Sequence, residues 1–268
     1  MGQQVSYRNY SGTAAEAYER FFVPAIGEPI ATHLLDAAAL QPGEQVLDVA
    51  CGTGVVSRMA ADRVGSAGTV VGVDVAPDML EVAGASAAGR PIEWRQGDAA
   101  SLPLPDGSFD IVLCQMGLML FGDKPAALSE MRRVLAVDGR LVLNTPGTIN
   151  RPMEIFAEAL ARHLNPDLAG FVHAVFSMAD PTEHEAVLRD AGFRDVRATV
   201  VTAILHLPAP RDFLWQYINL TPLALFVNDA PDDVKAALED DVVGPWEAIV
   251  GDDGGALDQA VVVATARA

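Results

Sequence analysis

The chain has 268 residues, of which half are hydrophobic and a fifth are charged, and its formal net charge at pH 7 is -18. This composition is typical of a globular protein with a sizeable hydrophobic core. Binding to nucleic acids or to anionic membranes depends on clustered Lys and Arg side chains, so the strong negative charge argues against both partners.

The chain carries only two cysteines, Cys51 and Cys114, and their spacing fits neither a disulfide framework nor a metal site. The first residues lack the charged start and apolar run of a signal peptide. The longest apolar stretches are shorter than the roughly 20 residues that span a bilayer. We therefore expect a cytoplasmic protein.

Two helices are expected before the first strand. Residues 13–22 form the first, opened by a capping box in which Glu16 follows Thr13 by three positions. Residues 25–40 form the second, which stops at Pro42-Gly43 because proline and glycine disfavour helix continuation.

From residue 45 onward, strand and helix patterns alternate. The strands are rich in Val, Leu and Ile, which indicates burial on both faces, as in a parallel sheet covered by helices. The sequence therefore predicts a doubly wound α/β fold. The strands are expected at 45–49, 69–74, 91–96, 109–114 and 140–144, and the helices at 53–63, 77–88 and 125–136.

The pattern changes after residue 150. Helices are expected at 151–164 and 181–191, strands at 195–205 and 259–266, and an aromatic-rich insertion at 210–250. The aromatic side chains between residues 213 and 226 fit either a substrate lid or the core of a helical cap. We expect three parts: N-terminal lid helices at 1–40, a ligand-binding core at 41–148, and a cap with the last two strands at 149–268.

A glycine-rich segment, Asp48 to Gly54, ends the first strand and leads into a helix. Glycines at the carboxyl end of a parallel strand let a ligand approach the backbone closely. Asp74 ends the second strand, where its carboxylate can accept both hydroxyls of a ribose. Together these features predict a nucleoside site.

A nicotinamide dinucleotide site is the rival interpretation, since Gly52, Gly54 and an acid twenty residues later partly match that fingerprint. Two features oppose it. Ser57 occupies the position of the third glycine, and the Asp48 carboxylate lies beside the loop that would hold a pyrophosphate. A carboxylate there suits an ammonium group better.

Four motifs occur in order: Asp48 to Gly54, Gly72-Val73-Asp74, Asp98-Ala99 with the tail Leu102 to Asp110, and Glu130 to Leu135. Over residues 40 to 145 this series resembles the class I S-adenosylmethionine (SAM) dependent methyltransferases, in particular the branch of ubiquinone, menaquinone and natural-product enzymes. The resemblance implies a Rossmann-like sheet of seven mostly parallel strands in the order 3-2-1-4-5-7-6, with a helical cap.

The resemblance also implies roles for individual residues toward SAM. Asp74 holds the ribose, and Gln115 faces the amino-acid portion. Tyr10 or Tyr18 closes over the cofactor. One departure is Ala76, where the family often has a side-chain oxygen that caps the next helix. The remaining assignments are Asp48, Ala50, Gly52, Thr53 and Gly54 on the methionine and ribose side, Val75 and Met79 flanking the adenine, and Asp98 and Ala99 reading its edge.

The resulting hypothesis is an enzyme that moves a methyl group from SAM to an oxygen, nitrogen or carbon of a small, largely apolar or aromatic metabolite. We expect no metal, and either a monomer or a homodimer. His173, in the apolar run from Phe171 to Phe176, is the candidate general base, although surface or packing roles are the usual ones for histidine. The alternatives are a SAM-binding fold used for rearrangement or decarboxylation, and a non-catalytic binding partner.

Overall fold

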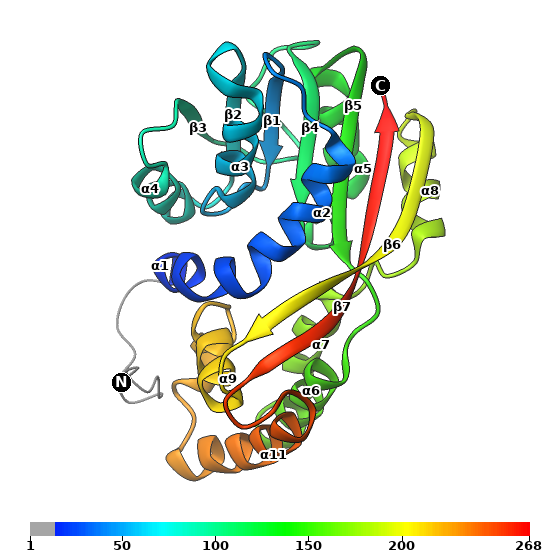
Figure 1. The fold of residues 1–268 in the computed structure, drawn as a ribbon. Coiled ribbons are helices and arrows are strands. Elements are labelled where there is room, and N and C mark those ends of the chain that lie inside the picture. Colours follow the sequence, from blue (N-terminus) through cyan, green and yellow to red (C-terminus); the bar gives the residue numbers. More distant parts are fainter. Residues whose placement is uncertain (1–13) are drawn as a thin grey trace. The chain divides into compact units, whose positions relative to one another are not determined.

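The computed structural model describes residues 14–268, and its contacts divide the chain into two compact units (Figure 1). Unit 1 consists of the chain up to Pro29 together with Thr148–Ser177 and Ala203–Gln259. Unit 2 consists of Ile30–Gly147, Met178–Thr202 and Ala260–Ala268. The expected capping box at Thr13 and the candidate Tyr10 lie outside the described residues.

The strands form one seven-stranded sheet in the order β3-β2-β1-β4-β5-β7-β6, which confirms the expected topology. The pairings β1–β2, β1–β4, β2–β3 and β4–β5 are parallel, and β5 pairs with β7 in antiparallel fashion. The strands are β1 (Gln45–Val49), β2 (Thr69–Asp74), β3 (Ile92–Gln96), β4 (Phe109–Gln115), β5 (Leu135–Pro146), β6 (Arg194–Leu207) and β7 (Gly255–Arg267).

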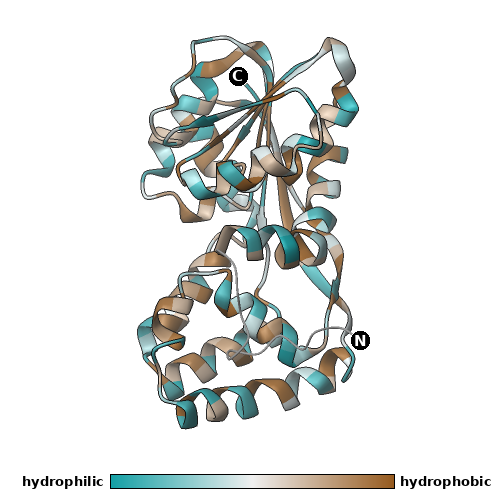
Figure 2. Ribbon diagram, turned by 90° about the vertical axis from the view of Figure 1, so that its left-hand side faces the viewer, coloured by the Kyte–Doolittle hydropathy of each residue, from teal (hydrophilic) through white to brown (hydrophobic). Residues whose placement is uncertain are grey.

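Unit 2 contains the sheet's parallel strands and the helices that cover them. The central strands β1 and β4 are buried almost throughout, as expected for a sheet covered on both faces. Figure 2 shows hydrophobic strands lying between helices on either side. The helices are α2 (Glu28–Ala38), α3 (Val55–Val64), α4 (Pro77–Ser86), α5 (Lys124–Val134) and α8 (Pro181–Asp190), with short 3₁₀ turns η2 (Gly65–Ala67) and η3 (Leu118–Leu120).

Unit 1 is mainly helical and has its own aromatic core. Phe156 packs edge-on against Trp246, whose indole N–H donates to the Pro152 carbonyl at 2.7 Å. Tyr217 and Phe213 complete the cluster. The helices are α1 (Ala14–Ala17), η1 (Tyr18–Gly27), α6 (Arg151–His163), α7 (Pro166–Val175), α9 (Pro210–Asn219), α10 (Ala224–Val227) and α11 (Asp232–Val250).

Three local features differ from the sequence expectations. The gap expected between the first two helices is absent, because a π-helical segment, η1, connects α1 to α2 and accommodates Pro24 in its interior. The strand expected at 140–144 extends from Leu135 to Pro146. Helix α7 was not anticipated, although Asn165 followed by Pro166 and Asp167 is a helix start signal.

Within residues 14–268, every helix is too short or too polar to cross a membrane.

Candidate functional site

The carboxyl ends of the parallel strands meet at one edge of the sheet in unit 2, where the topology changes direction between β1 and β4. A cavity of about 300 Å³ lies at this edge, near the lower end of the range for small-molecule sites. Its walls come from the residues that follow β1, β2, β3 and β4. The lining residues are Val49, Ala50, Val73, Asp74, Val75, Gly97, Asp98, Ala99, Ala100, Leu120, Phe121, Gly122, Asp123 and Ala127.

The Asp74 carboxylate anchors the loop after β1. Its Oδ2 atom accepts the Gly52 amide at 2.8 Å, and its Oδ1 atom accepts the Ala76 amide at 3.0 Å. The second bond ties the N-cap residue of α4 to the end of β2, while no side chain caps the helix itself. Each carboxylate oxygen keeps a second lone pair, so Asp74 can still accept hydroxyl groups of a bound sugar.

Asp48 is buried at the end of β1, with only 1% of its surface exposed. Ser57 on α3 donates its hydroxyl to Asp48 Oδ2 at 2.6 Å. Among the described residues, Asp48 Oδ1 and the neighbouring Thr53 hydroxyl are buried without any hydrogen-bond partner. Because unsatisfied buried polar atoms are costly, these two atoms point to a polar ligand that completes them.

The ring of Trp94 explains why residue 54, in the loop after β1, and residue 72, in β2, are glycines. Gly54 has φ of +85°, and a Cβ placed on it would lie 2.4 Å from the Trp94 ring. A Cβ on Gly72 would lie 2.6 Å from the same ring. At Gly54 the protein's own indole therefore fills space that we had expected a ligand to use, and at Gly72, within β2, the same ring excludes a side chain.

Asp98 begins a tight turn after β3. Its Oδ1 atom accepts the Ala100 amide at 2.9 Å, and its carbonyl accepts the Ser101 amide at 2.9 Å. The side chain of Asp98 is exposed and lines the cavity together with Ala99. This arrangement presents a carboxylate and a backbone segment to the same ligand surface.

Five of the expected site residues therefore line one cavity: Ala50, Asp74, Val75, Asp98 and Ala99. Asp48 lies at the end of β1, and Gly52, Thr53 and Gly54 belong to the loop that follows it. Met79 is half-buried on α4, and Gln115 ends β4, where its Oε1 atom lies 3.4 Å from Asn144 Nδ2. Their roles toward a ligand stay predictions.

Two candidates lie in unit 1 and are not part of this cavity. Tyr18 is on η1, where its ring stacks on Phe22 with centroids 4.5 Å apart. His173 is near the end of α7, and its side chain is exposed. Neither observation tests the lid role of Tyr18 or the general-base role of His173.

The cavity wall that follows β4 was not predicted from the sequence. Leu120 in η3 is 55% exposed and, with Phe121, lines the cavity. Val75, which follows β2, is another exposed apolar residue of the cavity lining, at 65%. Exposed apolar side chains beside a cavity suit a flat aromatic base. The position of Leu118–Phe121 after a parallel strand is the signal that could have found them.

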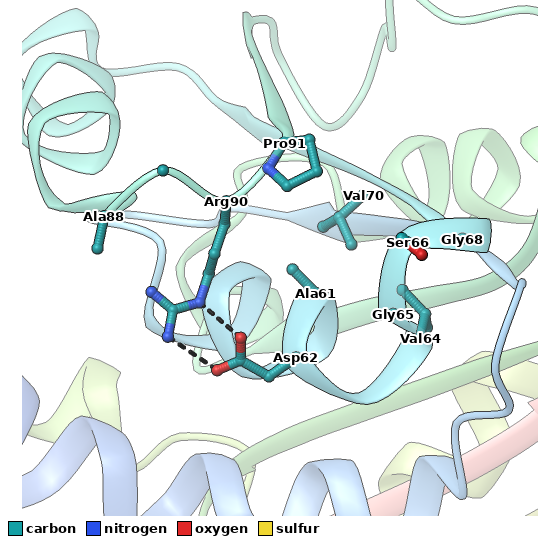
Figure 3. A pocket seen from close by; sticks show the side chains of 11 residues that line it. Ala61, Asp62, Val64, Gly65, Ser66, Gly68, Val70, Ala88, Arg90 and Pro91 are labelled. Carbon is teal, nitrogen blue, oxygen red and sulfur yellow. Dashed lines mark hydrogen bonds and ion pairs between the residues drawn. The ribbon is translucent and has the colours of Figure 1, made fainter.

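A second cavity, of about 660 Å³, lies at the opposite edge of the sheet, where β2 and β3 begin (Figure 3). Its charged side chains, Asp62 and Arg90, pair with each other through two hydrogen bonds of 2.7 and 2.9 Å. The pair leaves little unsatisfied charge for a ligand. We assign no function to this cavity.

Comparisons with known proteins show which family the chain belongs to. Residues 46–139 match a family model described as a methyltransferase domain. The chain is 34% identical over 208 residues to nocamycin O-methyltransferase of Saccharothrix syringae, an alignment that covers 71% of this chain and 74% of the relative. It is 43% identical over 111 residues to demethylmenaquinone methyltransferase of Thermus thermophilus, covering 41% of this chain and only half of the relative.

A solved structure of a SAM-dependent methyltransferase from Aquifex aeolicus has the same fold. The TM-score is 0.54 at 20% sequence identity, with 72% of this chain and 94% of the other covered.

Proposed function

Because the chain belongs to the class I SAM-dependent methyltransferases, we propose that the cavity at the carboxyl edge of its sheet binds SAM, and that the acceptor is a hydroxyl group of a small, apolar metabolite. The enzyme class and the cofactor follow from family membership. The residue roles and the chemistry of the acceptor are our proposal.

The main support for the proposed cofactor site is the pair of unsatisfied buried atoms, Asp48 Oδ1 and Thr53 Oγ1. SAM has an ammonium group that can donate to a carboxylate and a carboxylate that can accept from a hydroxyl. Asp48 at the end of β1 offers the acceptor, and Thr53 in the loop that follows offers the donor. The buried pair thus fits the amino-acid portion of SAM.

The cavity itself fits the nucleoside portion. Asp74 would accept the ribose hydroxyls, the apolar Val75 and Leu120 would contact the base, and the turn at Asp98 would read its edge. A charged carboxylate acceptor forms stronger hydrogen bonds than a neutral one, which favours a donor such as the exocyclic amine of adenine.

When bound, SAM supplies a sulfonium methyl group for transfer to a nucleophile. The chain's own contribution is to orient the cofactor through Asp48 and Asp74 and to limit the access of water to the reacting atoms. Among the titratable groups, His173 stays our candidate base for the hydroxyl proton.

The acceptor class rests on the relative with the longer alignment. The nocamycin enzyme is named an O-methyltransferase, and its alignment with this chain is about twice as long as the one with the menaquinone enzyme. We therefore favour oxygen over carbon as the methylated atom. The monomeric or homodimeric state and the cytoplasmic location also stay predictions.

Unit 1 contains the aromatic segment for which either a substrate lid or the core of a helical cap was expected. Phe213, Trp215, Tyr217 and Trp246 are buried, which makes them the unit's core. Leu225 and Phe226 on α10 are instead 75% and 57% exposed. Phe213, Trp215 and Tyr217 thus form core, and the lid interpretation stays a proposal for Leu225 and Phe226, whose side chains lie outside that core.

The test is an assay with SAM labelled in its methyl group and a panel of apolar phenols, enols, amines and quinones. The proposal expects labelled methyl ethers together with S-adenosylhomocysteine. Transfer to carbon or nitrogen alone would refute the assignment to oxygen. Binding of SAM with no transfer to any class would favour the non-methylating alternative.

A further inference from the structure

The motif Glu130 to Leu135 extends from the last turns of α5 to the first residue of β5. It does not line the cavity, since neither Glu130 nor Arg133 is among the described lining residues. The side chains of Glu130 and Arg133 form a bidentate ion pair, which we call the fork. Arg133 Nε donates to Glu130 Oε1 and Arg133 Nη2 to Glu130 Oε2, each at 2.7 Å. Paired hydrogen bonds of this kind fix the guanidinium plane.

The fork holds the segment that follows the Asp98 turn. Glu130 Oε2 accepts the Leu102 amide at 2.8 Å. Arg133 donates to the Leu102 carbonyl at 3.2 Å and to the Leu104 carbonyl at 2.9 Å. Both backbone groups of Leu102 are therefore held by the same pair of side chains.

Further hydrogen bonds with Arg133 hold the chain as far as Gly107. Arg133 Nη1 donates to Asp106 Oδ1 at 2.5 Å, and the Arg133 carbonyl accepts the Gly107 amide at 3.0 Å. The side chains of Leu102 and Leu104 are buried. Residues 102 to 107 are thus fixed to α5 by hydrogen bonds and by packing.

The turn that lines the cavity lies immediately before this fixed segment. On one side, the Gly97 amide donates to the Asp74 carbonyl at 3.0 Å. On the other side, the chain is clamped at Leu102. Pro103 packs against Gly97 so closely that a Cβ there would lie 2.6 Å from its ring. The position of Asp98 and Ala99 is therefore set by two anchors, of which the second is the fork on α5.

We propose that Glu130 and Arg133 are positioning residues for base recognition, which hold the Asp98 turn where its carboxylate and backbone can read the amino group of adenine. The inference rests on the proposed binding of SAM in the cavity. Neither side chain needs to touch the cofactor. Substitution of either residue should reduce the preference for adenine over other bases more than it reduces the overall affinity for the cofactor.

The pairing also keeps Glu130 charged. Hydrogen bonds from Arg133 are the largest cause of the lowered pKa of Glu130, opposed by partial burial and supported by the Leu102 amide. The fork therefore stays intact throughout the neutral range.

The experiment compares two ligands by calorimetry: S-adenosylhomocysteine and its inosine analogue, in which an oxo group replaces the adenine amine. The wild type should prefer the adenine ligand. Arg133→Lys, which keeps the charge but loses the fork, should reduce that preference about tenfold, on the scale of one hydrogen bond to a charged group. Glu130→Gln, which keeps an acceptor for the Leu102 amide, should reduce it less.

Arg189→Lys is the matched control, because Arg189 forms a similar helical pair with Glu185 at 2.7 Å on α8, and neither residue lines the cavity. It should leave the preference unchanged. If the folded Arg133 and Glu130 variants keep the wild-type preference, the positioning role is wrong. A wild type that binds both ligands equally would also overturn it, whereas a wild type that binds neither would refute the cofactor site itself.

Discussion

The hydroxyl of Ser57 donates to Oδ2 of Asp48 at 2.6 Å, while Oδ1 of the same carboxyl group has no partner in the described part of the chain. The pKa of Asp48 is raised to about 7, mainly by burial; the Ser57 hydrogen bond opposes the shift, and the negative charge of Asp74 adds to it. The free protein therefore holds a proton on Asp48 below neutral pH, at the place where we expect the cationic end of SAM.

SAM binding should release this proton. An ammonium group beside Asp48 favours the ionised carboxylate, so binding near pH 6.5 removes a proton that the free protein carries. Titrations in two buffers with different ionisation enthalpies should give different apparent binding enthalpies, and affinity should rise from pH 6 to pH 8. Asp48→Asn serves as the control, because it has no proton to lose. Equal enthalpies in both buffers for the wild type would contradict the assignment.

The same group should make stability depend on pH. An unfolded Asp titrates near 3.8, whereas folded Asp48 titrates near 7, so the folded state binds more protons between these values and loses stability as pH rises through them. The shift corresponds to at most about 4 kcal/mol. Asp48→Asn should be more stable relative to wild type at pH 8 than at pH 4 in urea unfolding. A constant difference across this range would show that the pKa of Asp48 is ordinary.

Removal of the Asp74 carboxylate should weaken SAM binding. Asp74→Ala removes the acceptor for the ribose hydroxyls and also frees the amides of Gly52 and Ala76. We expect a loss of affinity of about tenfold or more, measured by calorimetry on folded protein. Asp62→Ala, at the second cavity, should leave the affinity unchanged. An unaltered affinity in Asp74→Ala would refute its role.

The contact between Gly72 and Trp94 predicts a non-additive pair. Gly72→Ala would push a methyl group into the indole and should destabilise the protein by about 1–3 kcal/mol. In a Trp94→Leu background the same change should cost much less, which a double-mutant cycle in urea would measure. Gly170→Ala on α7 has no described atom within 4 Å of the new methyl group and should be neutral or stabilising. Additive costs would mean that the indole does not limit Gly72.

The exposed side chains of α10 provide a test of acceptor binding. Leu225→Ser and Phe226→Ser should raise the acceptor KM several-fold, since apolar contact is lost, while the affinity for SAM stays the same. Val137→Ser, at a 92% exposed position of β5, is the matched control and should change neither quantity. Unchanged acceptor kinetics in the α10 variants would remove these residues from the acceptor site.

The strands of the sheet could be predicted well because buried strands are marked in the sequence by runs of apolar residues. Strands β1 and β2 were placed with their observed bounds, since their Val and Leu runs are required by helices on both faces. Asp74, Asp98 and Ala99 were placed at one edge because parallel strands end together. These inferences need only periodicity and chain order.

Other features depend on contacts that no local pattern encodes. The π-helical segment η1 has the same apolar spacing as an ordinary helix, so its wider turns were not visible. The role of Trp94 beside Gly54 and Gly72 requires knowledge of three different elements. Leu120 was missed because its exposed position in η3 depends on the path of the loop after β4.

The cofactor site is tested most directly by calorimetric titration of S-adenosylhomocysteine into the folded wild type and into Asp74→Ala. We expect one site per chain in the wild type and weakened binding in the variant. A folded wild type that does not bind S-adenosylhomocysteine, or a variant that binds it equally well, would show that the cavity at the carboxyl edge is not the cofactor site.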